Sequence, residues 1–211
     1  ERHNIERISL FGGESRVLKA DVLMKRYWWE QQKINVQKSS IAGRLKQVDE
    51  RGQETYKKQL DSLVSVGDSL DMWWRNKLIQ TCSQLIHLPL ERDDEAYLRY
   101  QLGELYYSQE AEAYMREYAE YETAMIRWDS CMTLVAEKDT VSIGPKPQPP
   151  RQSHTRSMSY YRQVIDRFPE TRFVPAAMYG LAWCYSNIEK IDSSIVYMSR
   201  LVEQHPGHSY A

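Results

Sequence analysis

The sequence predicts an all-α protein, in which a long helical hairpin or coiled-coil-like arm is joined to a short α-solenoid of helical repeats. Two observations support this fold class. Apolar residues recur at alternating steps of three and four along nearly the whole chain, which is the spacing of one face of a helix. The 211 residues include only nine glycines and eight prolines, and no segment alternates β-branched and polar residues as a half-buried strand does.

Residues 1–74 are predicted to form two long helices connected by a turn. A heptad seam with two polar interruptions runs from Val17 to Val48, and the same spacing resumes at Leu60. Between them, the charged, glycine-containing run at 50–53 is typical of a turn between helices. This half of the chain is therefore expected to be a region of long helices.

Two tryptophan pairs, Trp28–Trp29 and Trp73–Trp74, lie within these helices. Neighbouring residues on a helix point about 100° apart. One ring of each pair can therefore enter the core while the other covers a flank or meets a partner. Core packing is the favoured interpretation.

The run Gly67-Asp68-Ser69-Leu70 resembles the motif that opens the esterase and lipase family named after these four residues. In that family the serine follows a β-strand and is accompanied by a Gly-x-Asn-Asp block and an Asp-x-x-His block. Here the helical period continues through the motif, and neither block occurs in the sequence. A serine without a base is not activated, so a hydrolase is the less favoured hypothesis. Gly67 is expected either to let two helices approach closely or to mark a helix junction, with Asp68 or Ser69 as its N-cap.

Residues 75–211 contain a second kind of periodicity, typical of helix–turn–helix repeats. Its most regular copy has small residues where two antiparallel helices touch, large residues around them, and a final proline that ends the second helix. The residues at these positions are Met178, Leu181, Ala182, Tyr185, Ser194, Met198 and Pro206. Their spacing resembles that of a tetratricopeptide repeat.

A second copy of the repeat is split by an insertion. Its two helices carry Arg99, Leu102, Gly103 and Tyr106, then Ser157, Tyr161 and Pro169. About 42 more residues separate these helices than separate the helices of the intact copy. The inserted segment is about residues 108–152.

The insertion is predicted to contain one long helix and a proline-rich return loop. Steps of three and four favour a helix of about 30 residues, or about 45 Å. The residues on these steps are Ala111, Tyr114, Tyr118, Tyr121, Met125, Trp128, Met132 and Val135. Four prolines between residues 145 and 150 favour an extended loop, interpreted as a semi-rigid spacer rather than a docking segment. The apolar face of the inserted helix is expected to pack against the N-terminal half, giving an arm of residues 14–75 with 108–138.

The order of these segments resembles envelope-associated tetratricopeptide repeat proteins of Gram-negative bacteria. The resemblance rests on the helix LGELYY, the long helix rich in Tyr, Met and Glu, the proline-rich loop and YYRQVIDRFP. Large repeat proteins of the gliding machinery are most similar; outer-membrane-assembly lipoproteins and the coordinator of the Tol-Pal system are similar more loosely. The resemblance implies a non-catalytic scaffold that holds proteins or peptides in the groove lined by the first helix of each repeat. The groove residues that it implies are Tyr97, Tyr100, Glu104, Tyr107, Tyr179, Trp183, Ser186 and Asn187. The alternative left open is that the inserted arm fills this groove.

Composition argues against several classes of function. The 28 Lys and Arg against 29 Asp and Glu leave no basic excess for nucleic acid, and no apolar run reaches the ~20 residues of a membrane span. Three distant cysteines and five scattered histidines suggest no metal or cofactor site. The acidic runs at 93–95 and 110–112 are interpreted as a helix N-terminal turn and a solvated helix face, rather than as catalytic carboxylates.

The sequence therefore predicts a non-enzymatic protein–protein interaction scaffold without cofactors, in a bacterial envelope assembly in the periplasm or at the outer membrane. A cytoplasmic adaptor or regulatory module is the alternative, favoured by the three unpaired cysteines. The chain begins without Met and is expected to be part of a longer protein. Its partners are expected to be other proteins, and a homo-oligomer formed through the helical arm is left open.

Overall fold

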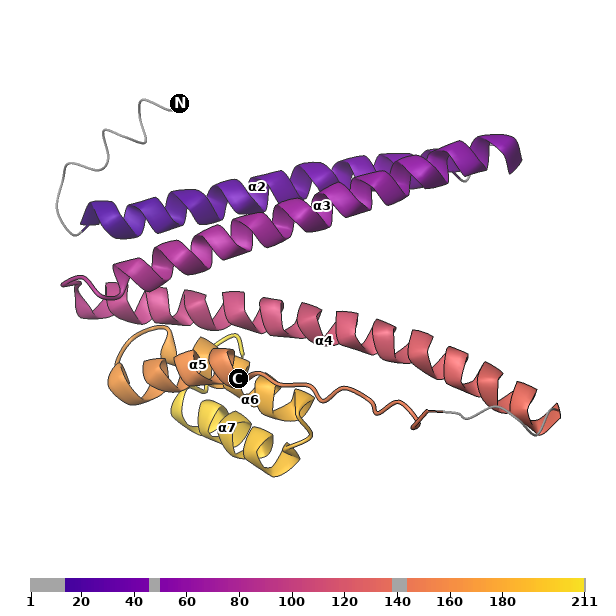
Figure 1. Cartoon of the computed structure of the whole chain (residues 1–211). Helices are drawn as coiled ribbons and strands as arrows, with labels where there is room; N and C mark the ends of the chain where they lie inside the picture. The colour runs from indigo at the N-terminus through magenta and orange to yellow at the C-terminus, as the bar shows by residue number, and fades with distance from the viewer. Residues whose placement is uncertain (1–13, 46–49, 138–143, 211) are drawn as a thin grey trace. The chain divides into compact units, whose positions relative to one another are not determined.

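The computed structural model describes residues 14–45, 50–137 and 144–210 of the chain, and every regular element in this part is an α-helix (Figure 1). The helices are α2 (Glu14–Leu45), α3 (Glu50–Leu85), α4 (Arg92–Glu137), α5 (Thr155–Arg167), α6 (Val174–Asn187) and α7 (Ile191–Gln204). The all-α prediction is confirmed. None of the described helices combines the length and the hydropathy of a segment that spans a bilayer.

The chain divides into two compact units, Glu1–Leu98 and Arg99–Ala211, and the division falls inside α4. The domain boundary expected after residue 74 lies within α3. The N-terminal unit therefore includes all of α3 and the first residues of α4. The C-terminal unit holds the rest of α4 together with α5, α6 and α7.

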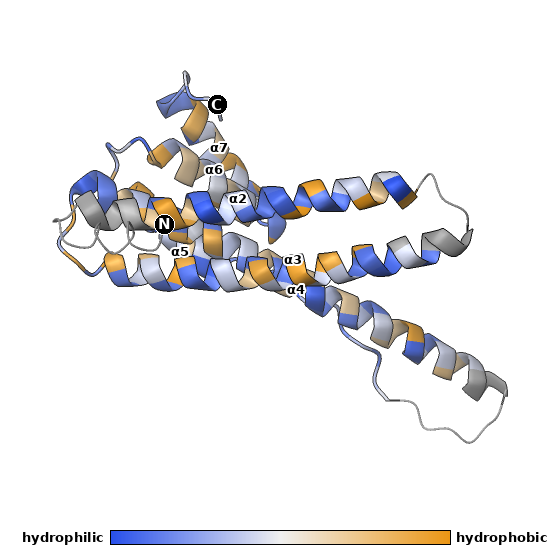
Figure 2. Cartoon of the chain, turned by 90° about the horizontal axis from the view of Figure 1, so that it is seen from above, coloured by the Kyte–Doolittle hydropathy of each residue, from blue (hydrophilic) through white to orange (hydrophobic). Residues whose placement is uncertain are grey.

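In the N-terminal unit, α2 and α3 run antiparallel and side by side (Figure 1), and hydrophobic and hydrophilic residues alternate along both helices (Figure 2). The predicted seam positions with described side chains in α2 are all buried or partly buried: Ala20, Met24, Tyr27, Gln31, Ile34, Lys38, Ile41 and Leu45. The prediction of a turn between helices at 50–53 is wrong, because these residues already belong to α3 and form its first helical turn. One glycine costs a helix only about 1 kcal/mol, and its Glu, Arg and Gln neighbours are good helix formers.

Gly67 lies in the middle of α3, where the two helices approach closely. A Cβ at this position would be 3.1 Å from Ile34 Cγ2. Because α3 continues unbroken through residues 67–70, the structure agrees with close helix approach and not with a helix junction.

The tryptophan pairs differ from each other. Trp74 is buried and Trp73 is 55% exposed, as expected for neighbours on a helix, and their rings meet edge to face. Trp28 and Trp29 are 61% and 57% exposed, so the expectation that one of them enters the core is wrong. The seam of α2 passes through Tyr27, which turns both following side chains away from α3.

A polar cluster explains why the seam contains Gln31. Asp71 of α3 accepts hydrogen bonds from the Tyr27 hydroxyl, from Gln31 Nε2 at 2.8 Å, and from the buried Arg75 guanidinium. A buried charge is tolerated when it is paired and hydrogen bonded, and this carboxylate has three donors. The polar interruption in the heptad pattern is therefore part of the packing between α2 and α3.

The helix predicted for the insertion and the predicted first helix of the split copy are one continuous helix, α4. α4 runs without a break for 46 residues, which is about 69 Å at ~1.5 Å per residue. No proline occurs between Arg92 and Glu137, and nothing else in the sequence ends the helix near residue 108. The packing of this helix against α2 and α3 would join the two units and stays a prediction.

The proline-rich segment returns along α4 as an extended chain. At its start, Trp128 Nε1 donates to the Gly144 carbonyl at 3.1 Å; at its end, the Glu110 carboxylate accepts from the Arg156 backbone N–H at 2.9 Å. Ten extended steps from Gly144 to His154 cover about 31 Å at ~3.1 Å each. This matches the ~27 Å between Glu110 and Trp128 on α4.

The core of the C-terminal unit lies between α4, α5, α6 and α7. Buried residues at the predicted repeat positions include Leu102, Ser157, Tyr161, Met178, Leu181, Ala182, Tyr185 and Ser194. Most residues that the repeat pattern assigns to helix contacts are therefore buried, both in the intact copy and in the segments predicted to form the split copy.

Candidate functional site

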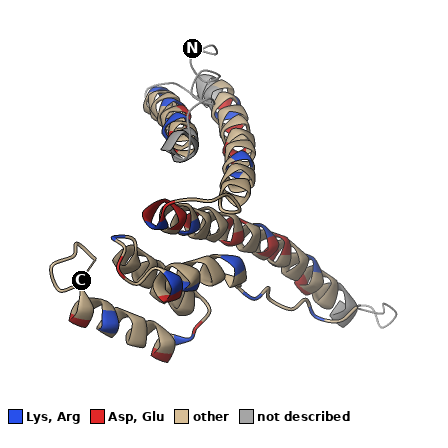
Figure 3. Cartoon of the chain, turned by 90° about the vertical axis from the view of Figure 1, so that its left-hand side faces the viewer, with Lys and Arg blue, Asp and Glu red and all other residues tan. Residues whose placement is uncertain are grey.

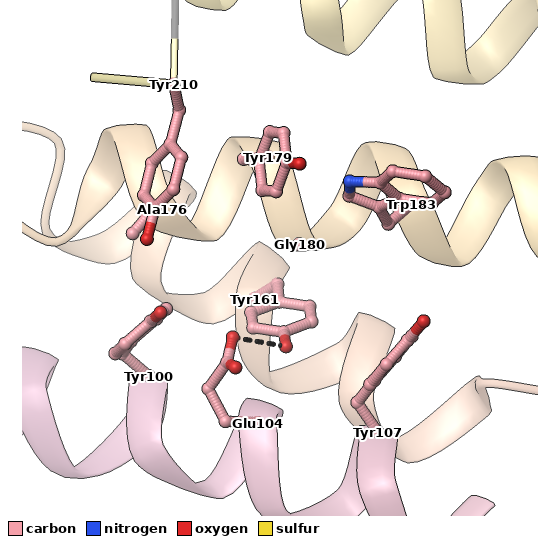
Figure 4. A pocket seen from close by; sticks show the side chains of 9 residues that line it. All are labelled: Tyr100, Glu104, Tyr107, Tyr161, Ala176, Tyr179, Gly180, Trp183 and Tyr210. Carbon is pink, nitrogen blue, oxygen red and sulfur yellow. Dashed lines mark hydrogen bonds between the residues drawn. The ribbon is translucent and has the colours of Figure 1, made fainter. Parts of the chain in front are cut away.

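A pocket of about 310 Å³ lies in the C-terminal unit, between α4, α5, α6 and the segment that follows α7 (Figure 4). It is lined by Tyr100, Glu104, Tyr107, Tyr161, Ala176, Tyr179, Gly180, Trp183 and Tyr210. Six of these nine residues are aromatic, and Glu104 carries the only charge among them. We call this site the aromatic pocket.

Helical spacing places the walls of the aromatic pocket. On α4, Tyr100, Glu104 and Tyr107 follow at steps of four and three, so they share one face. On α6, the step from Tyr179 to Trp183 does the same. Figure 4 shows the α4 side chains opposite those of α6, with Tyr161 of α5 between them.

Tyr161 forms the floor of the pocket because the two helices beside it carry glycine. A Cβ at Gly103 would be 2.5 Å from Tyr161 Cε1, and a Cβ at Gly180 would be 2.7 Å from Tyr161 Cζ. The ring is only 1% exposed, and its hydroxyl donates to Glu104 Oε1 at 2.7 Å. Burial and the negative charge of Glu104 raise the pKa of Tyr161, so the phenol stays neutral.

Glu104 holds its carboxylate among tyrosines. Burial first, and the charge of Glu104 second, also raise the pKa of Tyr100. The helix that carries this carboxylate is acidic, with eleven Asp or Glu against four Arg and no Lys (red and blue in Figure 3). The one charged group in the pocket lining is therefore negative, and the helix that carries it has a net negative charge.

The rings are held against one another, and part of the site is open to solvent. Tyr179 stacks on Tyr210 with centroids 4.7 Å apart and planes 12° apart, and meets Trp183 edge to face at 6.1 Å. Tyr100 stacks on Phe173 at 6.1 Å. Trp183 is 45% exposed, so a partner can reach the pocket at this edge.

The structure brings together five of the eight residues expected to line the groove: Tyr100, Glu104, Tyr107, Tyr179 and Trp183. Asn187 lies just outside, where its Nδ2 donates to the Tyr107 hydroxyl at 3.0 Å. Ser186 is partly buried on α6 and does not line the pocket. Tyr97 belongs to the N-terminal unit, where its hydroxyl donates to Asp21 at 2.5 Å.

The sequence interpretation missed Tyr161, Gly180, Ala176 and Tyr210 as pocket residues. The repeat pattern assigns Tyr161 to a core position, and it is indeed buried, but its hydroxyl edge also faces the pocket. Nothing in the local sequence signals Tyr210, because its place depends on how residues 205–210 fold back over α6.

A buried polar cluster supports the pocket from behind. The His154 ring stacks on Tyr107 at 4.8 Å, and its Nε2 lies 3.4 Å from Asn187 Nδ2. Its Nδ1 is buried without a hydrogen bond, 3.9 Å from a Glu110 oxygen. Burial lowers the pKa of His154, while Glu110 acts in the opposite direction, so the imidazole is neutral at pH 7.

This cluster does not have the electrostatics of a nucleophilic site. Cys184 Sγ lies 3.6 Å from Ser157 Oγ, but burial raises the pKa of Cys184 to about 12. A protonated, buried thiol is a poor nucleophile. The Ser157 hydroxyl donates to Glu110 at 2.8 Å, and this bond helps to join α5 to α4.

Ser69 of the esterase-like motif lies on the exposed side of α3. Its hydroxyl donates to the Ser65 carbonyl, one turn back, at 2.9 Å. This is the local bond that serines commonly make inside helices. The strand end that presents the nucleophile in the esterase family is replaced here by a continuous helix.

Comparison with known families identifies the class of this fold. A family model of the tetratricopeptide repeat matches residues 176–208, so α6 and α7 form a tetratricopeptide repeat. The protein is thus an all-helical protein with a repeat of this type, a kind of fold that is typically non-catalytic and generally mediates protein–protein interaction. No curated protein and no solved structure matches the chain significantly.

Proposed function

We propose that this protein is a non-catalytic interaction module that binds a segment of a partner protein in the aromatic pocket. The observation that carries the proposal is the pocket itself, in which three helices and the segment after α7 present six aromatic rings around one carboxylate. Tyr and Trp dominate the energetics of protein interfaces because they bury large areas and lose few rotamers on binding. The match of residues 176–208 to a family of interaction repeats supports the same function.

The size of the pocket limits what it accepts. Its volume of about 310 Å³ lies at the lower end of the ~300–1,000 Å³ typical of ligand sites. Such a pocket holds one or two side chains of a peptide rather than a large cofactor. The rest of the peptide would lie along the exposed surface near Trp183.

The cellular setting that we propose is a multiprotein assembly of a Gram-negative envelope, on the periplasmic side or at the outer membrane. This setting is supported by the resemblance in segment order described above. The alternative is a cytoplasmic adaptor. Selective release of the full-length protein with the periplasmic fraction would support the envelope setting, and its recovery with cytoplasmic markers would favour the adaptor.

Selection of peptides tests the binding proposal. A random peptide library displayed on phage would be selected on the 211-residue chain and counter-selected on a Tyr100→Ala, Trp183→Ala double variant. The matched control is Val196→Ala, since Val196 is 55% exposed on α7 outside the pocket. Peptides that bind wild type and the control but lose affinity for the double variant are expected. Peptides that bind all three proteins equally would refute the pocket as the binding surface.

A second candidate surface is the N-terminal hairpin, where Trp28, Trp29 and Trp73 are all more than half exposed. Exposed tryptophans on helices are typical of interfaces. We propose that they mediate self-association through the arm. Light scattering after size exclusion should then show an oligomer for wild type and a monomer for a Trp28→Ser, Trp29→Ser variant; a wild-type monomer at high concentration would reject this second function.

A further inference from the structure

The charge of the aromatic pocket indicates what kind of side chain it accepts. None of its nine lining residues, all of them described, is Lys or Arg, and its one charged group is Glu104. Two arginines of the neighbouring helices bond to other residues, Arg99 to Gln163 and Arg162 to the Tyr185 hydroxyl. A carboxylate or phosphate in the pocket would thus meet aromatic rings and a like charge, with no basic side chain among the residues that line the pocket.

Elsewhere in the C-terminal unit, the chain covers its own aromatic rings with arginine. Arg156 lies over Tyr106 at 5.5 Å, and Arg162 over Tyr185 at 5.6 Å. Arg200 likewise lies over Tyr197, with its guanidinium carbon 5.6 Å from the ring centroid. By contrast, in the part of the chain that the structure describes, no Lys or Arg lies over any of the six pocket rings.

From this complementarity we infer that the pocket binds an arginine side chain of the partner protein. The inference rests on the proposed function and specifies the residue that anchors the peptide. The guanidinium is planar, weakly hydrated and suited to stacking on aromatic faces. In the pocket the guanidinium stacks on the rings of Tyr179 and Trp183 and donates hydrogen bonds to the Glu104 carboxylate.

The net charge of α4 has the same sign as Glu104. Its eleven Asp or Glu against four Arg favour the approach of a basic segment at low ionic strength, and salt screens this attraction. An apolar anchor would fill the volume but would leave Glu104 without a cation. Arginine can stack on the aromatic rings and also donate hydrogen bonds to the Glu104 carboxylate. Leucine and phenylalanine can make only the first kind of contact, so we choose arginine.

Short synthetic peptides test this inference on the 211-residue chain. The probes are Ac-Gly-Gly-Xaa-Gly-Gly-NH2 with Xaa as arginine, citrulline, leucine or glutamate. Citrulline is the matched control, because it has the length and planar end group of arginine without the charge. Binding would be followed by NMR shifts of the Trp183 indole N–H and of backbone amides around the pocket.

Two variants separate the parts of the mechanism. Glu104→Gln removes the charge while keeping an oxygen that can accept from the Tyr161 hydroxyl. Trp183→Leu removes an aromatic face while keeping an apolar side chain, at a position exposed enough to leave the core intact. Val196→Ala again serves as the control outside the pocket, and circular dichroism checks that all variants fold.

The arginine peptide is expected to bind wild type about tenfold more tightly than the citrulline peptide, a ratio equivalent to ~1.4 kcal/mol. Glu104→Gln should bring the affinities of the arginine and citrulline peptides close to each other. Trp183→Leu should lower the affinity for the arginine peptide, and Val196→Ala should change neither affinity. Equal binding of arginine and citrulline, tighter binding of leucine or glutamate, indifference to both pocket variants, or no binding of the arginine peptide would each overturn the inference.

The phage selection decides the proposed function separately. Pocket-dependent phage peptides anchored by apolar or acidic residues would leave the proposed function standing while arginine recognition fails. The absence of any pocket-dependent phage peptide would refute the proposed function together with this inference.

Discussion

Replacing Gly103 with alanine should destabilise the C-terminal unit, although alanine is the better helix former. The added Cβ would be 2.5 Å from Tyr161 Cε1 and 2.7 Å from Cδ1, whereas non-bonded carbons normally stay ~3.5–4.0 Å apart. The ring cannot move away, because Gly180 of α6 lies against it and its hydroxyl is bonded to Glu104. Overpacking of this kind costs about 3 kcal/mol at the upper end of its range. Helix propensity returns about 1 kcal/mol, so the net loss is about 2 kcal/mol.

The control for Gly103→Ala is Gly43→Ala on α2, where the added Cβ meets nothing within 4 Å. That variant should be stabilised by up to ~1 kcal/mol. Urea and thermal unfolding, followed by circular dichroism, measure both changes. Hydrogen exchange of α5 and α6 amides reports the C-terminal unit alone. A Gly103→Ala protein as stable as Gly43→Ala would refute the close packing of Tyr161 between its two glycines.

Two further predictions concern buried groups. Burial lowers the pKa of His154 in the folded protein below its ordinary 6.5, so the unfolded chain takes up the proton more readily. The contribution of His154 to stability is therefore complete above about pH 6.5. It is lost as the pH falls toward the lower pKa of the folded protein. Urea titrations between about pH 7.5 and 5 should show stability declining with acid, and His154→Phe should flatten this dependence; equal slopes in both proteins would contradict the assignment. Burial also raises the pKa of Cys82 and Cys184 to about 12, whereas Cys131 is exposed. A disulfide-exchange reagent should therefore modify only Cys131 in the native protein and all three thiols in urea, and rapid modification of Cys82 or Cys184 without denaturant would contradict their burial.

Most of the fold could be predicted from the helical spacing of apolar residues. The buried face of a helix repeats every three or four residues, whichever helix packs against it. This spacing placed the described seam residues of α2 in or near the interface with α3, and assigned Tyr161 and Leu181 to helix contacts. The prediction failed where helical spacing gives no information, namely at the ends of helices. Gly52 and its charged neighbours resemble the sequence of a turn, but they form the first turn of α3. A helix can likewise continue past residue 108 when no breaker stops it.

The candidate site was predictable only in part, for a physical reason. Period shows that Tyr97, Tyr100, Glu104 and Tyr107 share one face of a helix, but it does not show where one compact unit gives way to the next. That change comes after Leu98, so Tyr97 binds Asp21 while the other three line the pocket. The floor of the pocket depends on Gly103, Tyr161 and Gly180 meeting from three helices. Such a meeting is a property of tertiary packing and leaves no signal in any one helix.

α4 and α5 are joined by a long connection, and their register is set by packing between the two helices rather than by that connection. α5 lacks a side-chain cap of its own at His154. The backbone N–H groups of Arg156 and Ser157 donate instead to the Glu110 carboxylate of α4, at 2.9 and 3.3 Å. A carboxylate at this end of a helix also interacts favourably with the helix dipole. The Glu110 cap and the Tyr161–Glu104 bond fix α5 against α4 at two points about one and a half turns apart. These two contacts hold the floor of the pocket in place without any contribution from the C-terminal half of α4.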